Sequence, residues 1–173
     1  MPMDETVLYE TRFIQLVQRG RWVFARRTSE IKVVAVVAVT DDEKLLLVEQ
    51  FRIPVDASVI ELPAGLAGDT GDPNEPLQNA AQRELLEETG YSAESWSELA
   101  NVTSSAGMTN EQVAIFRARD LKRKTGGGGV EGEQITVHEV PVSELETWLQ
   151  RQATAGKMID SRVYAELHWV ATV

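Results

Sequence analysis

Residues Glu75 to Tyr91 read EPLQNAAQRELLEETGY, and the fold class follows from this stretch. Apolar residues recur every four positions from Leu77 to Leu85, a spacing typical of a helix that packs one face on a core. Gly90 favours the left-handed conformation that ends a helix. The pattern therefore predicts a helix that runs from about Glu75 to Thr89.

Three glutamates of this predicted helix, Glu84, Glu87 and Glu88, lie within about 100° of one another around the helix axis. Like charges at these spacings repel, and Arg83 is the nearest cation that offsets them. A divalent cation such as Mg²⁺ or Mn²⁺ removes the conflict, because it takes carboxylate oxygens as ligands. The cluster predicts a metal site; the alternative is a solvated acidic face.

The sequence from Glu75, continued after seven residues by Arg83-Glu84-Leu85-Leu86-Glu87-Glu88-Thr89-Gly90-Tyr91, resembles the Nudix box, the signature of the Nudix hydrolases. The box fixes many positions at set spacing, so it is more specific than a lone glycine-rich loop. The family's opening glycine usually lies six residues before the first glutamate, where this chain has Asp69. We interpret Gly65 as its equivalent, with about four extra residues tolerated in the loop that follows.

Further segments resemble the ADP-ribose and nucleotide-sugar branch of the same family. These segments are Gln50-Phe51-Arg52, Glu61-Leu62-Pro63-Ala64-Gly65, the glycine-rich acidic loop 126–133, and Gly156-Lys157-Met158-Ile159-Asp160 before a final helix. The resemblance implies an α/β fold, an α/β/α sandwich with a mixed sheet. It also implies a homodimer to which the N-terminal strands, residues 1–30, contribute.

Apolar patterns predict the remaining elements. Alternation from Glu5 to Arg27 indicates antiparallel strands, and the apolar runs Val33 to Val39 and Lys44 to Val48 indicate a buried hairpin. Helices are predicted from Ser143 onward and from Ser161 to Val170. No repeat or long linker divides the 173 residues, so we expect one domain.

Composition excludes several classes. The net charge of −10 argues against a nucleic-acid binder, because phosphate backbones require Lys and Arg. The chain has no cysteine, so it forms neither disulfides nor a thiolate metal site. No signal pattern and no apolar run of about 18 residues is present, which argues against a membrane protein and predicts a cytoplasmic one.

Roles in metal binding follow from the resemblance. Glu84 and Glu88, one helical turn apart, are the expected direct ligands of Mg²⁺, and Mn²⁺ is the alternative ion. The resemblance implies that Glu87 assists as a ligand or from the second layer around the metal. It also implies that the main-chain carbonyl of Ala64 supplies another oxygen and that Arg83 orients the carboxylates through ion pairs.

The general base is expected outside the helix. In the resembling branch it comes from a mobile loop, which here is the segment 126–133. Its four consecutive glycines predict a flexible loop that closes over substrate, and a solvated loop is the alternative. Glu131 and Glu133 are the candidates in this loop, and Glu111 is a third.

Substrate contacts are assigned to residues outside the box. Arg52 is expected to grip the distal phosphate, with a salt bridge at a strand end as the alternative. Gln50 and Glu111 are further candidates, and the resemblance implies that Trp22 stacks on the base across the dimer interface. ADP-ribose hydrolases usually carry a proline before Gly107; this chain has Ala106, which favours GDP-mannose or another nucleotide sugar.

The predicted function is Mg²⁺-dependent hydrolysis of the pyrophosphate bond of a nucleoside diphosphate sugar, such as ADP-ribose or GDP-mannose. The products are a nucleoside monophosphate and a sugar phosphate. Bound Mg²⁺ neutralises phosphate charge and activates a water molecule. The alternatives are another Nudix substrate, such as a dinucleoside polyphosphate, and a non-catalytic nucleotide-sugar sensor.

Overall fold

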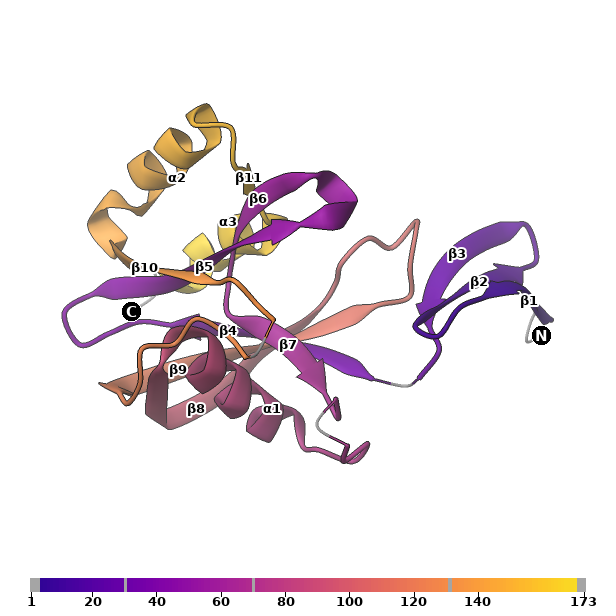
Figure 1. Cartoon of the computed structure of the whole chain (residues 1–173), viewed down its shortest axis with the longest axis horizontal. Coiled ribbons are helices and arrows are strands. Elements are labelled where there is room, and N and C mark those ends of the chain that lie inside the picture. The colour runs from indigo at the N-terminus through magenta and orange to yellow at the C-terminus, as the bar shows by residue number, and fades with distance from the viewer. Residues whose placement is uncertain (1–3, 30, 70, 131, 171–173) are drawn as a thin grey trace.

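The computed structural model describes residues 4–29, 31–69, 71–130 and 132–170. Its first sheet is antiparallel and lies to one side of the main body, at the right of Figure 1. The alternation between Glu5 and Arg27 indicated a hairpin or two antiparallel strands; the pairing is antiparallel as expected, but the sheet has three strands. It consists of β1 (Glu5–Glu10), β2 (Ile14–Arg19) and β3 (Trp22–Arg27).

Two four-stranded sheets form the main body. In the sheet ordered β7-β4-β9-β8, β4 and β9 are parallel and the other pairs are antiparallel, so the sheet is mixed as expected. Its strands are β4 (Lys32–Ala38), β7 (Ala64–Ala67), β8 (Tyr91–Thr103) and β9 (Gln112–Arg123). The other sheet, ordered β10-β5-β6-β11, contains β5 (Lys44–Arg52), β6 (Ala57–Glu61), β10 (Thr136–Pro141) and β11 (Met158–Ile159).

The predicted hairpin of Val33–Val39 with Lys44–Val48 is wrong. β4 and β5 belong to different sheets and share only an isolated bridge between Val39 and Leu45. The reason is that both edges of β4 are already paired, one with β7 and one with β9. The apolar run correctly indicated burial, because alternate residues of β4 pack into two different core clusters.

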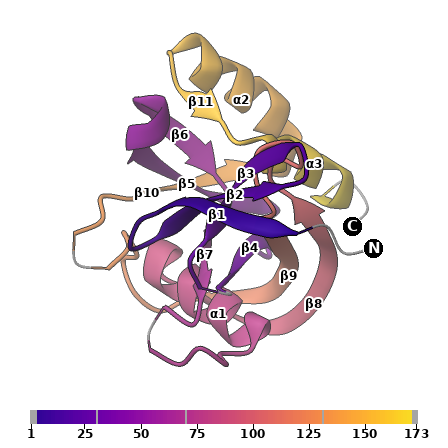
Figure 2. The same ribbon diagram turned by 90° about the vertical axis from the view of Figure 1, so that its right-hand side faces the viewer.

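Helices cover the two outer sides of the sheets, which gives the expected α/β/α arrangement (Figures 1 and 2). On one side lies α1 (Leu77–Glu84), which continues as a single π-helical turn, Leu85–Thr89. On the other side lie α2 (Leu145–Thr154) and α3 (Ser161–Val170). Gly90 ends the first helix with φ +78°, as the sequence predicted. Two short 3₁₀ turns, Ile53–Val55 and Val142–Glu144, complete the secondary structure of the described chain.

The hydrophobic core has two parts, one on each side of β4 and β9. The part beneath α1 includes Ala80, Ala81 and Leu85, which are fully buried. The stripe predicted from the sequence therefore faces the sheet, and it leaves the acidic face of the same helix for other contacts. Among the described helices, none is long and apolar enough to cross a membrane.

Candidate active site

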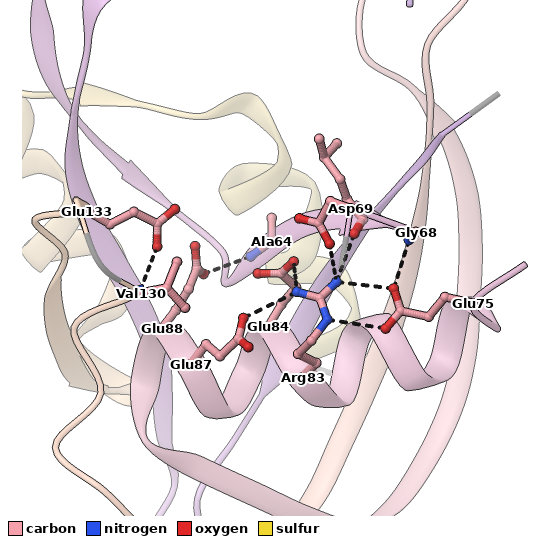
Figure 3. A network of polar contacts seen from close by, with 11 residues as sticks. Ala64, Gly68, Asp69, Glu75, Arg83, Glu84, Glu87, Glu88, Val130 and Glu133 are labelled. Atoms are coloured by element: carbon pink, nitrogen blue, oxygen red, sulfur yellow. Dashed lines mark hydrogen bonds and ion pairs between the residues drawn. The ribbon is translucent and has the colours of Figure 1, made fainter. Parts of the chain in front are cut away.

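Arg83 lies at the centre of a network of polar contacts on α1 (Figure 3). Burial lowers the pKa of its guanidinium, but the hydrogen bond to Glu75 and the charge of Glu84 outweigh burial and raise that pKa. The group is therefore a permanent cation that holds several carboxylates in place. Its acceptors, with nitrogen–oxygen distances, are Glu84 (2.7 Å), Asp69 (2.9 Å), the Leu66 carbonyl (2.9 Å), Glu75 (3.2 Å) and Glu87 (3.2 Å).

The carboxylate of Glu84 packs directly on Gly65. A β-carbon at position 65 would lie 2.0 Å from both Cδ and Oε1 of Glu84, far closer than any real contact. Only glycine admits this carboxylate, which is 8% exposed. The close approach gives a physical reason for a glycine at position 65, the residue that we interpret as the opening glycine of the box.

Glu88 is the most deeply buried acid of the cluster. It is 4% exposed, and its Oε2 accepts a hydrogen bond of 3.0 Å from the backbone N–H of Ala64. Burial, together with the charges of Glu84, Glu133 and Glu61, raises the pKa of Glu88 to about 8, although the Ala64 hydrogen bond opposes the shift. The protein surroundings therefore disfavour the charged form of Glu88.

These residues fit a divalent cation. Burial also raises the pKa of Glu84, even though Arg83 opposes the shift. Buried carboxylates with too little positive charge nearby are hard oxygen ligands of the kind that Mg²⁺ prefers. Within the described residues, no three acidic or imidazole groups are already arranged around one point. Contacts to Arg83 and to Ala64 hold the carboxylates apart, so a cation would use the oxygens that these contacts leave free.

The glycine-rich segment 126–129 forms a loop, as expected, and it lies against the end of the acidic helix. The N–H of Gly128 donates to the carbonyl of Glu88 at 2.8 Å, and the N–H of Gly129 donates to the carbonyl of Glu87 at 3.0 Å. The last carbonyls of a helix have no partner within the helix. The loop supplies these partners for the two residues that carry the acids.

Close packing explains why glycine is needed in this loop. Gly127 has φ +67°, and a β-carbon there would lie 2.4 Å from the carbonyl carbon of Thr89. From this anchored segment the chain continues to Glu133, whose Oε2 accepts a hydrogen bond of 2.9 Å from the N–H of Val130. The other predicted base in the loop, Glu131, lies outside the described residues.

A cavity of about 510 Å³ opens beside the carboxylates. It brings together residues that the sequence analysis selected from five separate segments, and four charged residues to which it assigned no role. The selected residues are Gln50, Arg52, Ala64, Glu84, Glu88, Glu111 and Glu133; the unassigned ones are Arg27, Glu61, Asp69 and Arg162.

Three of the selected residues that the structure describes do not line this cavity: Arg83, which binds the carboxylates from behind, Glu87 and Trp22. Glu87 is half-buried and binds Arg83 from the helix surface. Trp22 begins β3 in the separate N-terminal sheet and is 55% exposed. A role for Trp22 in binding a base would therefore require a second copy of the chain, as the resemblance implied.

Two ion pairs line the cavity, and they show why local sequence patterns missed some of its residues. Arg27 donates from Nε and Nη2 to Glu111, 84 positions along the chain, at 3.0 and 2.7 Å. Arg52 donates from Nε to Glu61 at 2.7 Å. The salt bridge weighed as the alternative for Arg52 is thus present, and Arg52 lines the cavity as well. The sequence analysis noted Glu61 only as part of the Glu-Leu-Pro-Ala-Gly motif, and it assigned no role to this residue.

Comparisons with known proteins define the class. A model of the NUDIX domain matches residues 30–166. This chain therefore belongs to the Nudix family. The matched region begins after the N-terminal sheet and contains both four-stranded sheets and the acidic helix.

Several curated relatives match. They are a methanol dehydrogenase activator of Bacillus methanolicus (33% identity, 69% of this chain, 63% of the relative), an ADP-ribose pyrophosphatase of Bacillus subtilis (40%, 51% and 45%) and a GDP-mannose pyrophosphatase of Cronobacter sakazakii (34%, 60% and 56%). The aligned segments thus span less than two thirds of each relative. A solved structure described as an ADP compounds hydrolase shares the fold, with a TM-score of 0.68 over 85% of this chain and 80% of that chain, at 21% identity.

The contact between Gly65 and Glu84 leads to a first prediction. Gly65→Ala is expected to push the Glu84 carboxylate aside and to weaken Mg²⁺ binding by about tenfold to a hundredfold, the range for residues that orient metal ligands. Isothermal titration calorimetry with MgCl₂ measures the change. Gly107→Ala is the control, because its added β-carbon meets no atom within 4 Å and its φ is not positive. Equal Mg²⁺ affinity in Gly65→Ala and wild type would contradict the prediction.

Burial of Glu88 leads to a second prediction, for the metal-free protein. Because burial raises the pKa of Glu88 from 4.5 to about 8, the folded state binds this proton more tightly than the unfolded chain. Its contribution to the free energy of unfolding is therefore full below about pH 4.5 and is lost as the pH rises through about 8. Glu88→Gln is expected to remove this loss and to be more stable than wild type at pH 9, by about 2–5 kcal/mol.

Urea denaturation in EDTA at pH 5, 7 and 9 measures this difference. Glu146→Gln, a change of an exposed glutamate on α2, is the matched control and should follow the wild type at each pH. A stability gap between Glu88→Gln and wild type that does not grow with pH would show that the Glu88 carboxylate is not strained by burial.

Proposed function

We propose that this protein hydrolyses the pyrophosphate bond of a nucleoside diphosphate sugar, with Mg²⁺ as cofactor and Mn²⁺ as the alternative ion. The observation that carries the proposal is the cavity in which buried acids, Glu84 and Glu88, meet cationic donors. A pyrophosphate needs both: oxygen ligands for a metal ion and guanidinium groups for its remaining charge. Relatives named as ADP-ribose and GDP-mannose pyrophosphatases support this substrate class.

The metal site consists of Glu84 and Glu88, with Glu87 in support through Arg83. When bound there, Mg²⁺ supplies charge neutralisation for the phosphates and lowers the pKa of a coordinated water. Arg83 orients the helix carboxylates, since it pairs with Glu84 and Glu87 directly. Ala64 fixes Glu88 through its N–H, and we assign its carbonyl as a further ligand.

Glu133 is the proposed general base. It lines the same cavity as Glu88, and its charge raises the pKa of Glu88, so it lies on the side of the site where a base would act on the attacking water. Glu111 is less suited, because the guanidinium of Arg27 donates two hydrogen bonds to its Oε2. We assign Glu111 the role of holding Arg27, and Glu133 the role of accepting a proton from the attacking water.

The cavity leaves space for a substrate longer than pyrophosphate. The Arg27–Glu111 pair also lines a neighbouring cavity of about 640 Å³, which contains none of the box acids. A nucleotide sugar therefore has room to extend past this pair while its phosphates remain beside the acids. Gln50 lines the catalytic side and offers an amide to sugar or phosphate oxygens.

We further propose that the active form is a homodimer joined through the N-terminal sheet. Large apolar residues of this sheet are exposed, among them Tyr9 and Phe13 at 67% each, Trp22 at 55% and Ile14 at 49%. An apolar surface of this kind is typical of an interface. The occupant is a second copy, which would also bring Trp22 to a site. The cytoplasmic location expected from the sequence stays a prediction.

Glu84→Gln and Glu88→Gln test the metal and the activity together. Each variant is expected to lower kcat by about three orders of magnitude, or roughly 4 kcal/mol of barrier, because an amide does not neutralise the cation. The assay is chromatography of products from ADP-ribose, GDP-mannose, ADP-glucose, UDP-glucose and diadenosine polyphosphates with Mg²⁺. Glu146→Gln on α2 serves as control. Wild-type turnover in either site variant at saturating Mg²⁺ would refute the assignment.

The same panel separates the alternatives. Cleavage confined to the diadenosine compounds would identify a dinucleoside polyphosphate hydrolase. Tight binding of a nucleotide sugar without any product would indicate a sensor. The relative named as a methanol dehydrogenase activator is the reason to include this alternative.

The dimer has its own test. Light scattering coupled to gel filtration is expected to give twice the 19.2 kDa chain mass for wild type and one chain mass for Leu16→Glu. Leu16 is 41% exposed on β2, and a glutamate there would be buried without a partner in the dimer. Gln150→Glu, which introduces the same charge at an exposed residue of α2, is the control. A monomeric wild type would contradict the dimer.

A further inference from the structure

The segment Gly156–Asp160 has no role in the proposed chemistry so far, yet it reaches the active site. Its strand β11 pairs in parallel with β6, so Ile159 lies beside Ile60. The N–H of Asp160 donates to the carbonyl of Ile60 at 2.9 Å. This pairing places Asp160 and the start of α3 next to Glu61, the last residue of β6.

Asp160 fixes the side chain of Arg162. Its Oδ1 accepts two hydrogen bonds from Arg162, one from the backbone N–H at the start of α3 (2.7 Å) and one from Nε (2.9 Å). Its Oδ2 accepts Nη2 at 2.7 Å. Burial raises the pKa of Asp160, but these bonds to Arg162 outweigh it and lower that pKa. Arg162 is thus a fully charged group with one side of its guanidinium already occupied.

Glu61 lies between two guanidinium groups. It is 5% exposed, its Oε2 accepts Nε of Arg52 at 2.7 Å, and its Oε1 lies 3.7 Å from Nη2 of Arg162. Both arginines line the same cavity as Glu84 and Glu88. Glu61 therefore joins a strand-end arginine and a helix-start arginine that are 110 positions apart in the numbering of the chain.

The outer nitrogens of both arginines remain available. Within the described residues, Nη1 and Nη2 of Arg52 and Nη1 of Arg162 donate no hydrogen bond, whereas the inner nitrogens face Glu61 and Asp160. The carboxylates of Glu61 and Asp160 balance the two cations, so this part of the cavity is neutral but rich in donors. The part at Glu84 and Glu88 is rich in acceptors instead.

A purely structural role explains this arrangement less well. Asp160 alone would suffice to begin α3, because its carboxylate already accepts the backbone N–H of Arg162. That role does not require the guanidinium to line a cavity beside the box acids. Nor does it explain why the buried carboxylate of Glu61 faces the inner nitrogens of two arginines. This arrangement leaves their outer nitrogens for a ligand with several oxygens.

We propose that Arg162 acts together with Arg52 as a clamp for the phosphate group that the acidic part of the site does not hold, and that Glu61 and Asp160 position this clamp. The proposal rests on the proposed function and extends it to the residues that bind the second phosphate. Arg162 is a substrate-binding residue in this scheme. Glu61 and Asp160 act only through the arginines.

The test measures pyrophosphate binding and nucleotide-sugar turnover separately. In Arg162→Gln, the Kd of inorganic pyrophosphate with Mg²⁺, from calorimetry, and the KM for the cleaved nucleotide sugar are each expected to rise by about tenfold or more. The kcat is expected to change by less than about threefold. The Mg²⁺ affinity without pyrophosphate should stay at the wild-type value, which a general loss of structure would not allow.

Two further variants guard against misfolding. Arg162→Lys keeps a cation for Asp160 but has a single nitrogen, so it is expected to fold and still to raise the KM. Glu61→Gln should raise the KM in the same way and add little to Arg162→Gln when the two are combined, since both act on one clamp. Arg151→Gln, the same change at an exposed arginine of α2, is the control.

The outcomes separate the clamp from the proposed function. If wild type binds pyrophosphate and Arg162→Gln does not, but no nucleotide sugar is cleaved, the clamp stands and the proposed function fails. Wild-type values of KM and pyrophosphate Kd in Arg162→Gln and Arg162→Lys would overturn the clamp while leaving the hydrolase intact. A wild type that does not bind pyrophosphate at all would overturn the clamp as well.

Discussion

The ion pairs of Arg83 are the interaction on which the site depends. One guanidinium, largely shielded from water, neutralises part of the charge of Glu75, Glu84 and Glu87 at once. Without it, carboxylates at these helical spacings would repel one another and turn toward solvent. With it, the acidic face can lie against β7 and the inserted loop that contains Asp69. That loop, which is longer than the family pattern, thus contributes a carboxylate to the network and does not interrupt it.

Backbone geometry provides the second constraint, because glycines leave the space that the acidic helix and its neighbours need to pack closely. Gly65 leaves room for the carboxylate of Glu84, and Gly90 and Gly127 allow the ends of two segments to touch. A β-carbon on Gly90 would lie 2.4 Å from the carbonyl oxygen of Thr125. The acidic helix, the strand before it and the loop that presents Glu133 are therefore packed together by close contacts that only glycine permits.

Local periodicity was sufficient for some parts of this structure and not for others. The helix, its apolar stripe and its acidic face follow from spacing within one segment, and the structure confirms them. The hairpin of the Val33 and Lys44 runs was wrong, because both edges of β4 find other partners that lie far along the chain. The Gly126 segment is a loop as its composition indicated, but its hydrogen bonds to carbonyls of a helix far along the chain could not be predicted. Arg162 was missed for the same reason: only the pairing of β11 with β6 brings it near the acids.

The distribution of charge shows how a protein with a net charge of −10 could receive the negatively charged substrate proposed above. Acceptors and donors are separated within one cavity: Glu84 and Glu88 lie on α1 and its π-helical turn, whereas Arg52 and Arg162 come from β5 and α3. Neither group is fully satisfied alone, because Glu88 is buried beside other acids and the outer nitrogens of Arg52 and Arg162 have no acceptor among the described residues. A metal-bound pyrophosphate would satisfy both at once, since its cation would meet the acids and its oxygens the arginines. Complementarity of this kind favours a ligand with both charges over either a free cation or a free anion.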